Sequence, residues 1–348
     1  MKLPSVARHI QDRDHWLWAG VCLGALAAGG VMQAVHMRRI SHDPEHEPLG
    51  RPPEGRVRLV GSADGTILHA EVFGPEDGPT VVLIHGWTEA LQYWIYVIRA
   101  LSERGVRVVA YDQRGHGKSE SAREGDYGLE RFGDDLEAVL TACMPEGQQA
   151  VVAGHSLGAM SIVAWADHHD VTRRVGAAVL LNTGVGDLIA EQLLFPLPQI
   201  AQVLNRTVAT RGLLGNRAPL PRFSTPLSSA LIRYVAFGPE ASPAQVAFYE
   251  RMLVTSPADA RAKTGIAMSE MELHHALPRL TVPAIVIAGA EDRLTPPSHA
   301  TRIAGQLPQL RRLTILPDTG HMAPLERADA VIAAVVELVA LIAERVAV

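Results

Sequence analysis

The sequence of 348 residues predicts an α/β fold in which helices flank a mainly parallel central sheet. Short apolar runs of strand length alternate with stretches of helical character, which is the pattern of parallel strands joined by helical crossovers. Glycine-rich turns follow several of these runs. Hydrophobic residues make up 47% of the chain and charged residues 20%, which is enough apolar material for one large domain with an insertion.

An apolar segment near the N-terminus predicts a membrane anchor. Residues 16–35 contain no charged side chain and are about long enough to cross a bilayer as a helix. We therefore expect a tail over residues 1–15, a single-pass transmembrane anchor over residues 16–37, and a membrane location. Basic residues flank both ends, so the orientation stays open. A cleaved signal peptide is the alternative, because a small-x-small site lies at residues 25–27, but the apolar run continues past it.

The segment over residues 38–55 is expected to link the anchor to a globular domain. Much of it is rich in Pro, Glu and His and shows no periodicity. The domain then covers residues 56–348. Its first elements are two apolar runs, 57–60 and 67–73, separated by a turn-forming stretch, and they predict a hairpin.

A pentapeptide in the first half of the domain carries the strongest chemical signal. Gly154-His155-Ser156-Leu157-Gly158 follows the apolar run 150–153 and precedes a helix-like stretch over 159–166. This order predicts a strand, a sharp turn and a helix, with a serine at the apex of the turn. Small residues two positions either side of Ser156 allow the chain to bend so tightly.

Three further segments place polar residues after apolar runs. Residues 81–87 end in His85-Gly86-Trp87, and residues 108–119 run into a glycine-rich turn. The third segment is split between residues 289–293, which follow an apolar run, and residues 318–321 near the C-terminus. In chain order, these motifs offer a nucleophile, an acid and a base: Ser156, Asp292 and His321.

This set of motifs resembles the α/β-hydrolase superfamily, in particular serine esterase or lipase-like members with a helical cap. The order Ser, Asp, His is the one that this fold uses, and it differs from the orders of chymotrypsin-like and subtilisin-like enzymes. The resemblance covers roughly residues 56–348. Between the pentapeptide and Asp292, residues 184–276 show no clear strand pattern, so we expect a mostly helical cap there. Apolar residues over 188–200 and a Ser-Pro helix start at Ser242 support it.

The predicted triad follows from the weak nucleophilicity of a free serine. Ser156 needs His321 to accept its proton and Asp292 to fix the tautomer of that histidine. The resemblance implies that two backbone N–H groups, those of Leu157 and Trp87, form the oxyanion hole. It also implies that the remaining motif residues support these loops: His85, Gly86, Gly154, His155 and Gly158.

Other carboxylates compete for the role of the acid. Glu291 stands beside Asp292, and a less common variant of the family places the acid after the preceding strand, where Asp187 is available. Asp112 lies in a turn that is structural in the family. The nucleophile is serine rather than aspartate, which disfavours dehalogenase and epoxide hydrolase chemistry and leaves acyl-enzyme chemistry.

Composition excludes several other classes of function. The formal net charge of −5 and the lack of a basic stripe argue against nucleic acid as a partner. Cys22 and Cys143 are not expected to pair. His168 and His169 have no ligand cluster of suitable spacing around them, so we expect no metal and no cofactor.

The sequence therefore predicts a membrane-anchored serine hydrolase that cleaves carboxylic esters, with lipid-like esters such as monoacylglycerols as the expected substrates. A small-molecule or lipid ester would then be its binding partner. Within the same chemistry, the alternatives are a cofactor-free haloperoxidase or perhydrolase, a lactonase and a carbon–carbon bond hydrolase. Outside enzymology, the alternative is a receptor that binds a ligand without turnover.

Overall fold

The structure is a computed structural model that describes residues 28–188 and 214–346. Within these residues, an eight-stranded sheet has the order β1-β2-β4-β3-β5-β6-β7-β8. The strands β3 to β8 run parallel, whereas β2 is antiparallel to both of its neighbours. Their bounds are β1 Arg56–Gly61, β2 Ile67–Phe73, β3 Thr80–Ile84, β4 Arg107–Tyr111, β5 Ala150–His155, β6 Val175–Leu181, β7 Ala284–Gly289 and β8 Leu310–Leu316.

The apolar runs of the sequence become the central strands because helices cover both of their faces. Every residue of β3, β5, β6 and β7 is buried, whereas the edge strands β1 and β8 are mostly exposed or half-buried. Two hydrophobic cores result, one on each face. A continuous apolar run is expected where a parallel strand is covered on both sides.

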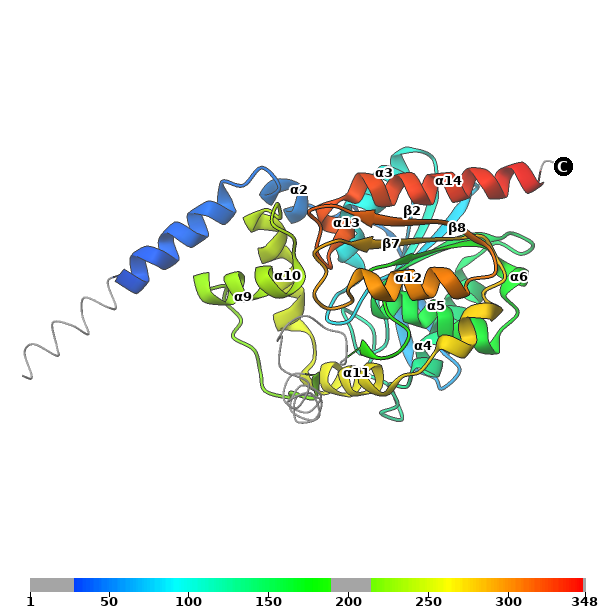
Figure 1. Ribbon diagram of the computed structural model, residues 1–348, viewed down its shortest axis with the longest axis horizontal. Helices are drawn as coiled ribbons and strands as arrows, with labels where there is room; N and C mark the ends of the chain where they lie inside the picture. The colour runs from blue at the N-terminus through cyan, green and yellow to red at the C-terminus, as the bar shows by residue number, and fades with distance from the viewer. Residues whose placement is uncertain (1–27, 189–213, 347–348) are drawn as a thin grey trace, which may run out of the picture.

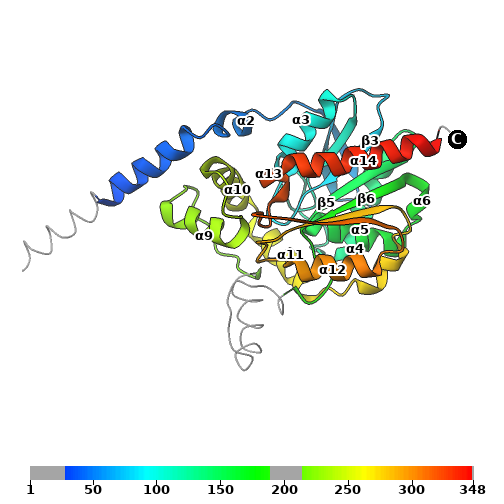
Figure 2. The ribbon, with the colours of Figure 1, turned by 45° about the horizontal axis from the view of Figure 1, so that its top comes forward.

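The helices divide between the two faces of the sheet, as Figures 1 and 2 show. On one face lie α3 (Ile95–Glu103) and α14 (Ala328–Val346), which contact each other. On the other lie α4 (Leu129–Cys143), α5 (Leu157–His168) and α12 (Pro297–Gln306). Short helical turns complete the connections: η1 Leu91–Trp94, α6 Val171–Arg174, η4 His274–Arg279 and α13 Ala323–Glu326.

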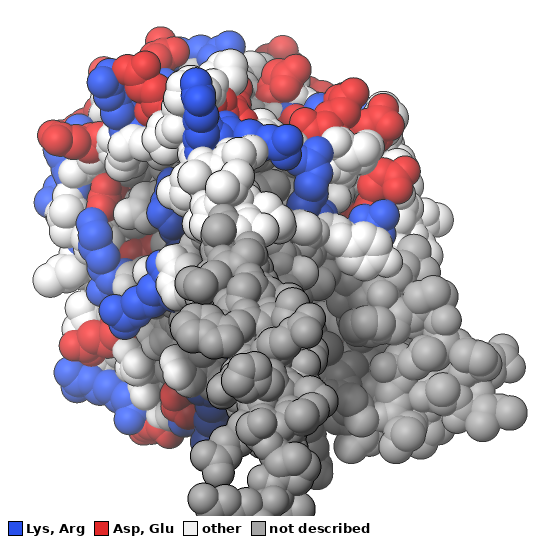
Figure 3. Space-filling view, turned by 90° about the vertical axis from the view of Figure 1, so that its left-hand side faces the viewer, with Lys and Arg blue, Asp and Glu red and all other residues white. Residues whose placement is uncertain are grey.

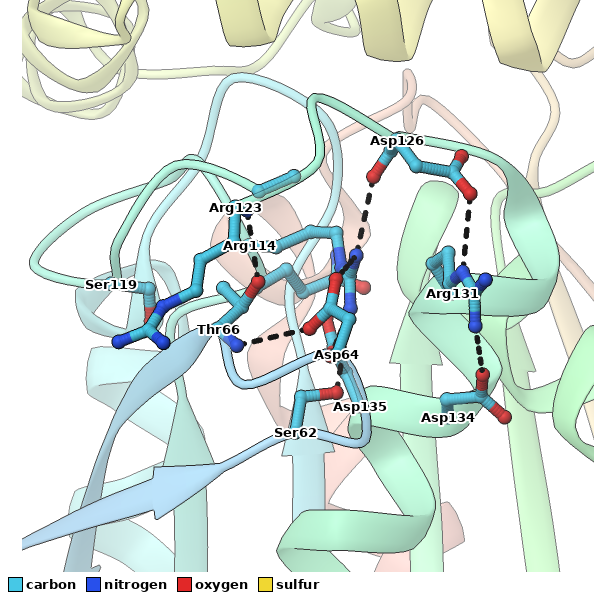
Figure 4. A network of polar contacts seen from close by, with 12 residues as sticks. Ser62, Asp64, Thr66, Arg114, Ser119, Arg123, Asp126, Arg131, Asp134 and Asp135 are labelled. Atoms are coloured by element: carbon cyan, nitrogen blue, oxygen red, sulfur yellow. Dashed lines mark hydrogen bonds and ion pairs between the residues drawn. The ribbon is translucent and has the colours of Figure 1, made fainter.

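A buried cluster around Arg114 ties the first hairpin to the loop after β4 (Figure 4). The Arg114 guanidinium donates two hydrogen bonds of 2.7 Å to the two carboxylate oxygens of Asp135 on α4. It also donates to Asp64 in the β1–β2 turn at 2.9 Å and to the carbonyl oxygen of Asp126 at 3.2 Å. The hairpin predicted from the sequence is therefore held to the core by charge-assisted hydrogen bonds.

Three described helices form the insertion between β6 and β7: α9 (Pro226–Ala236), α10 (Pro243–Thr255) and α11 (Ala258–Glu270). Both α9 and α10 begin with a capping box, and in α10 the Ser242 hydroxyl accepts from the Gln245 N–H. A capping box satisfies two backbone donors at once and fixes where a helix begins. Most of the apolar stretch over residues 188–200 lies outside the described residues.

The structure corrects the prediction of a membrane anchor. Neither residues 28–188 nor residues 214–346 contain a helix that is long and apolar enough to cross a membrane. Residues 28–41 are helical and extend from the body of the protein (Figure 1), and residues 16–27 of the predicted anchor lie outside the described residues. In this helix, Gln33 Nε2 donates to the Ser224 carbonyl oxygen at 2.7 Å. The polar side chain thus bonds to the insertion, a contact that average hydropathy does not register.

The segment expected as a linker also contains ordered structure. A short helix, α2 (His46–Gly50), lies in it, and the side chain of Leu49 is buried in the core on the α3 face. The Tyr96 hydroxyl of α3 hydrogen-bonds the Glu45 carboxylate beside α2. On the side of the molecule in Figure 3, basic and acidic side chains intermingle over the described surface.

Candidate active site

Ser156 stands at the apex of the turn between β5 and α5. Its φ of +51° lies in the left-handed region, which a residue other than glycine rarely adopts. Two hydrogen bonds hold the turn: the Ser156 N–H donates to the Leu181 carbonyl oxygen at 2.9 Å, and the Thr183 hydroxyl donates to the Ser156 carbonyl oxygen at 3.0 Å. Backbone strain that the surroundings hold in place is a common feature of functional sites.

The two glycines of the pentapeptide are sterically required. A Cβ on Gly154 would lie 2.5 Å from backbone atoms of Gly158, and a Cβ on Gly158 would lie 2.1 Å from the Ile84 carbonyl oxygen. These distances are far inside van der Waals contact. The two glycines therefore allow the start of α5 to pack directly on the backbones of β5 and β3.

Asp292 and His321 meet beside this elbow, although 29 positions separate them in the chain. Asp292 follows β7 and His321 follows β8, so the parallel strands deliver both residues to the same edge of the sheet as Ser156. Asp292 Oδ2 lies 2.8 Å from His321 Nδ1. The side chains of both residues are buried, with 0% and 5% of their surface exposed, respectively.

The charges of this pair shift both pKa values. Burial raises the pKa of Asp292, but the charge and hydrogen bond of His321 and the hydrogen bond of Asn182 outweigh it, so the pKa lies below its ordinary value. Burial lowers the pKa of His321, but the charge and hydrogen bond of Asp292 outweigh it, and the pKa lies above its ordinary value. The pair thus favours an ionised carboxylate beside an imidazole that is more basic than usual.

Three residues hold Asp292 in addition to His321. Its Oδ1 accepts from the N–H groups of Leu294 and Thr295, both at 2.9 Å, and its Oδ2 accepts from the Thr295 hydroxyl at 2.9 Å. The side-chain amide of Asn182 donates to Oδ2 at 3.0 Å and also to the Gly320 carbonyl oxygen at 3.0 Å. Sequence reasoning missed Asn182 and Thr295 as site residues.

The competing carboxylates do not reach His321 in this way. Asp292, rather than Glu291 or Asp187, makes the hydrogen bond to the imidazole. Asp112 instead accepts from the N–H groups of Leu91 and Lys118, at 2.7 and 2.8 Å, and so holds two loops together. Burial raises the pKa of Asp112.

Two backbone N–H groups beside the serine are suited to bind a developing oxyanion. Leu157 is the first residue of α5, so its N–H has no acceptor within the helix. Among the described residues, the Trp87 N–H likewise has no acceptor. The Trp87 indole donates to the Arg261 carbonyl oxygen of α11 at 3.0 Å, which links the loop to the insertion.

The loop that carries Trp87 is fixed by His85. His85 Nδ1 lies 2.7 Å from the Gly86 carbonyl oxygen, and its Nε2 accepts from the Gln113 N–H at 3.0 Å. This arrangement requires a neutral imidazole with its proton on Nδ1. Burial, with the nearby His116 ring, holds the pKa of His85 well below its ordinary value, which agrees with a supporting role.

Within the described residues, no hydrogen bond joins Ser156 Oγ to the His321 ring. Catalytic hydrogen bonds of ligand-free enzymes are often long and tighten when substrate binds. The described residues also contain no group of three or more His, Cys, Asp or Glu side chains that could hold a metal. His169, for which the sequence predicts no role as a metal ligand, lies 3.2 Å from the Asp134 carboxylate.

A family model of the alpha/beta hydrolase fold matches residues 79–328, which is most of the chain. The chain belongs to the α/β-hydrolase family. Among curated relatives of this family, the bifunctional esterase/perhydrolase DCH of Acinetobacter calcoaceticus is 25% identical, over 78% of this chain and 95% of that protein. A non-heme haloperoxidase of Rhodococcus erythropolis is 27% identical, over 78% of this chain and 96% of that protein.

Solved structures of other α/β hydrolases superpose on the chain. A hydrolase from Pseudomonas aeruginosa is 28% identical, with a TM-score of 0.64 over 82% of this chain and 99% of the other. A thermophilic esterase from Thermogutta terrifontis is 23% identical, with a TM-score of 0.66 over 82% of this chain and 99% of the other. The esterase shows the shared fold alone. These matches agree with the family match, which shows a hydrolase of the α/β fold.

Proposed function

We propose that this α/β hydrolase cleaves carboxylic esters in two steps through an acyl-enzyme on Ser156. The observation that carries the proposal is the convergence at one edge of the sheet of a strained serine, a buried His–Asp pair 2.8 Å apart and two backbone N–H groups for which the described residues offer no acceptor. In this scheme His321 takes the proton of Ser156 and passes it to the leaving alcohol. Asp292 fixes the imidazole tautomer and stabilises the imidazolium.

The oxyanion of the tetrahedral intermediate would be bound by the N–H groups of Trp87 and Leu157. Each such donor is worth about 10² to 10³ in rate. Water then attacks the acyl-enzyme with His321 again as the base. No step requires a metal or an organic cofactor, because the side chains supply the nucleophile, the base and the charge stabilisation.

The size of the acyl group is a separate part of the proposal. The lipid-like substrate expected from the sequence rested on a membrane anchor and on an apolar cap, and the anchor is corrected above. The described cap contributes apolar residues such as Phe237 and Phe248, both of which are buried in the core on the α3 face. Because these side chains pack in the core, they do not define an acyl pocket, and we leave the character and length of the acyl group to measurement.

The test is hydrolysis of p-nitrophenyl esters of increasing acyl length by the full chain, with Ser156→Ala and Ser102→Ala compared. Ser102 lies in the last turn of α3, which leads to the amino-terminal end of β4. The site lies at the carboxyl ends of the strands, on the opposite side of the sheet's length. We expect the wild type to hydrolyse these esters, and we expect Ser156→Ala to lower the rate by a factor on the order of 10⁶, if the triad acts as a unit. Ser102→Ala should hydrolyse the esters at the wild-type rate.

Perhydrolysis is the second candidate, and the likeness to the esterase/perhydrolase of Acinetobacter calcoaceticus favours it. In this reaction, hydrogen peroxide replaces water as the nucleophile that attacks the acyl-enzyme, and a peracid leaves. Adding hydrogen peroxide to the ester assay and measuring peracid separates the two reactions. A folded protein that turns over no ester and forms no peracid would contradict both.

A further inference from the structure

A second buried acid–histidine pair lies directly beside the proposed triad. His155 precedes Ser156 in the elbow, and Glu89 follows the loop that carries Trp87. Glu89 Oε1 lies 3.0 Å from His155 Nδ1, and the two side chains are 1% and 0% exposed. The triad described above uses neither residue.

The other contacts of this pair join three loops that converge on Ser156. Glu89 Oε2 accepts from the Gly86 N–H at 2.5 Å, inside the proposed oxyanion loop. His155 Nε2 lies 2.8 Å from the carbonyl oxygen of His321. A single pair of side chains therefore connects the oxyanion loop after β3, the elbow after β5 and the histidine loop after β8.

The geometry fixes how many protons the pair carries. The Glu89 carboxylate and the His321 carbonyl oxygen both accept hydrogen bonds, so each nitrogen of the His155 ring faces an acceptor. A proton must therefore lie on Nε2, and another must lie between Nδ1 and Glu89. Wherever that second proton sits, Glu89 and His155 together have no net charge. The Tyr93 hydroxyl, 3.4 Å from Nε2, can donate to Met322 Sδ instead.

The pair also fills its space completely. A Cβ on Gly86 would lie 2.8 Å from His155 Nδ1 and 2.9 Å from Glu89 Oε2. The His155 ring packs against the rings of Tyr93 and His321, with centroids 4.8 and 4.9 Å apart. A shift of either member would move the N–H of Trp87 relative to Ser156, or the backbone of His321 relative to both.

We propose that Glu89 and His155 act as a net-neutral positioning pair, which shares a proton and holds the oxyanion loop, the elbow and the histidine loop in one arrangement. This inference rests on the proposed esterase function. The pair touches no reacting atom, so its effect is on alignment. A misplacement of about 1 Å at such a site can cost a factor of about 10² in rate.

Three substitutions of Glu89 separate alignment from charge. Glu89→Gln can keep every contact, because its oxygen accepts from Gly86 and its amide donates to a neutral His155. Glu89→Asp keeps the carboxylate but is one methylene too short to reach both partners. Glu89→Ala removes both bonds. We expect kcat for p-nitrophenyl acetate near the wild-type value in Glu89→Gln and about 10²-fold lower in Glu89→Ala, with KM unchanged in both.

The matched control is a second buried His–Glu pair. His69 Nε2 lies 2.8 Å from Glu71 Oε1 on β2, three positions from β5 in the sheet. Glu71→Ala is expected to lower the melting temperature and leave kcat unchanged. If Glu89→Ala does not fold, Glu89→Asp decides, because it should lose kcat while Glu89→Gln does not.

Two results would overturn the inference. Wild-type kcat in both Glu89→Asp and Glu89→Ala would remove the positioning role, and a loss in Glu89→Gln as large as in Glu89→Ala would show that charge matters instead. The rate at which a fluorophosphonate modifies Ser156, compared across the same variants, reports alignment without an ester substrate. Failure of the proposed function would appear differently, as wild-type protein whose ester turnover is absent or survives Ser156→Ala.

Discussion

The clusters around Arg114 and around His321 are both buried and charged, but they are bonded differently. Arg114 and Asp135 are fully buried, and the guanidinium donates to the carboxylates of Asp135 and Asp64, to the Ser62 hydroxyl and to the Asp126 carbonyl oxygen. The pair of Asp292 and His321 is almost as buried, yet within the described residues the second nitrogen of His321 has no hydrogen-bond partner. A closed cluster stabilises loops, whereas a cluster with one open position beside a serine can move a proton.

The largest expected effect comes from replacing Asp292, the acid of the cluster around His321. Asp292→Asn keeps the size of the side chain but no longer stabilises the protonated imidazole or selects the tautomer that places the proton on Nδ1. We expect kcat to fall about 10⁴-fold with little change in KM. Steady-state hydrolysis of a p-nitrophenyl ester measures it. Glu291→Gln, on the adjacent residue, is the control, and an equal loss there would contradict the assignment of the acid.

The next largest effect comes from replacing Arg114 in its own cluster, and it should change stability but not activity. Arg114→Met leaves the carboxylates of Asp64 and Asp135 without their cation, and removing one partner of a buried ion pair costs about 3–5 kcal/mol. Urea unfolding measures this loss. Arg131, whose contacts with Asp126 and Asp134 are half-buried, is the matched control, and Arg131→Met should change stability far less. A lower kcat in folded Arg114→Met would contradict the separation of the two clusters.

The pH dependence of activity sharpens the comparison further. The proposed base must be neutral to accept the serine proton, so kcat/KM is expected to fall as the pH drops through the pKa of His321. That midpoint should lie above the ordinary histidine value of about 6.5, because the charge of Asp292 outweighs burial. The same raised pKa stabilises the fold below about pH 6.5, and that contribution is lost as the pH rises through the folded-state value. A midpoint below about 6.5 would show that burial dominates.

The smallest expected effect concerns Asn182, which donates to Asp292. Its φ is +45°, so Asn182→Gly removes the amide without adding backbone strain. We expect kcat to fall about tenfold, equivalent to about 1.4 kcal/mol, because Asp292 loses one of the donors that orient it. Asn216→Gly, at an exposed position before α9, serves as a control for the loss of an asparagine side chain. Unchanged kcat in Asn182→Gly would limit Asn182 to a structural role.

The sequence predicted the local features of this protein well, because short-range patterns determine them. The apolar runs that became β5 and β7, the elbow around Ser156 and the chain order of the motifs are all visible within a few residues. Asn182 and Glu89 are different, since their partners lie 110 and 66 positions away. Only the packing of neighbouring strands brings such residues together. The anchor prediction was wrong for a related reason, because hydropathy does not register the contacts of residues 28–41 with the insertion.

The central claim is that Ser156 is a nucleophile activated by His321. The most direct measurement is the mass of the peptide that carries residues 154–158 after reaction with a fluorophosphonate, in wild type, Ser156→Ala and His321→Ala. We expect one adduct per chain on Ser156 in wild type, none in Ser156→Ala, and a much slower reaction in His321→Ala. An ester-hydrolysing wild type without this adduct, or with the adduct on another residue, would contradict it.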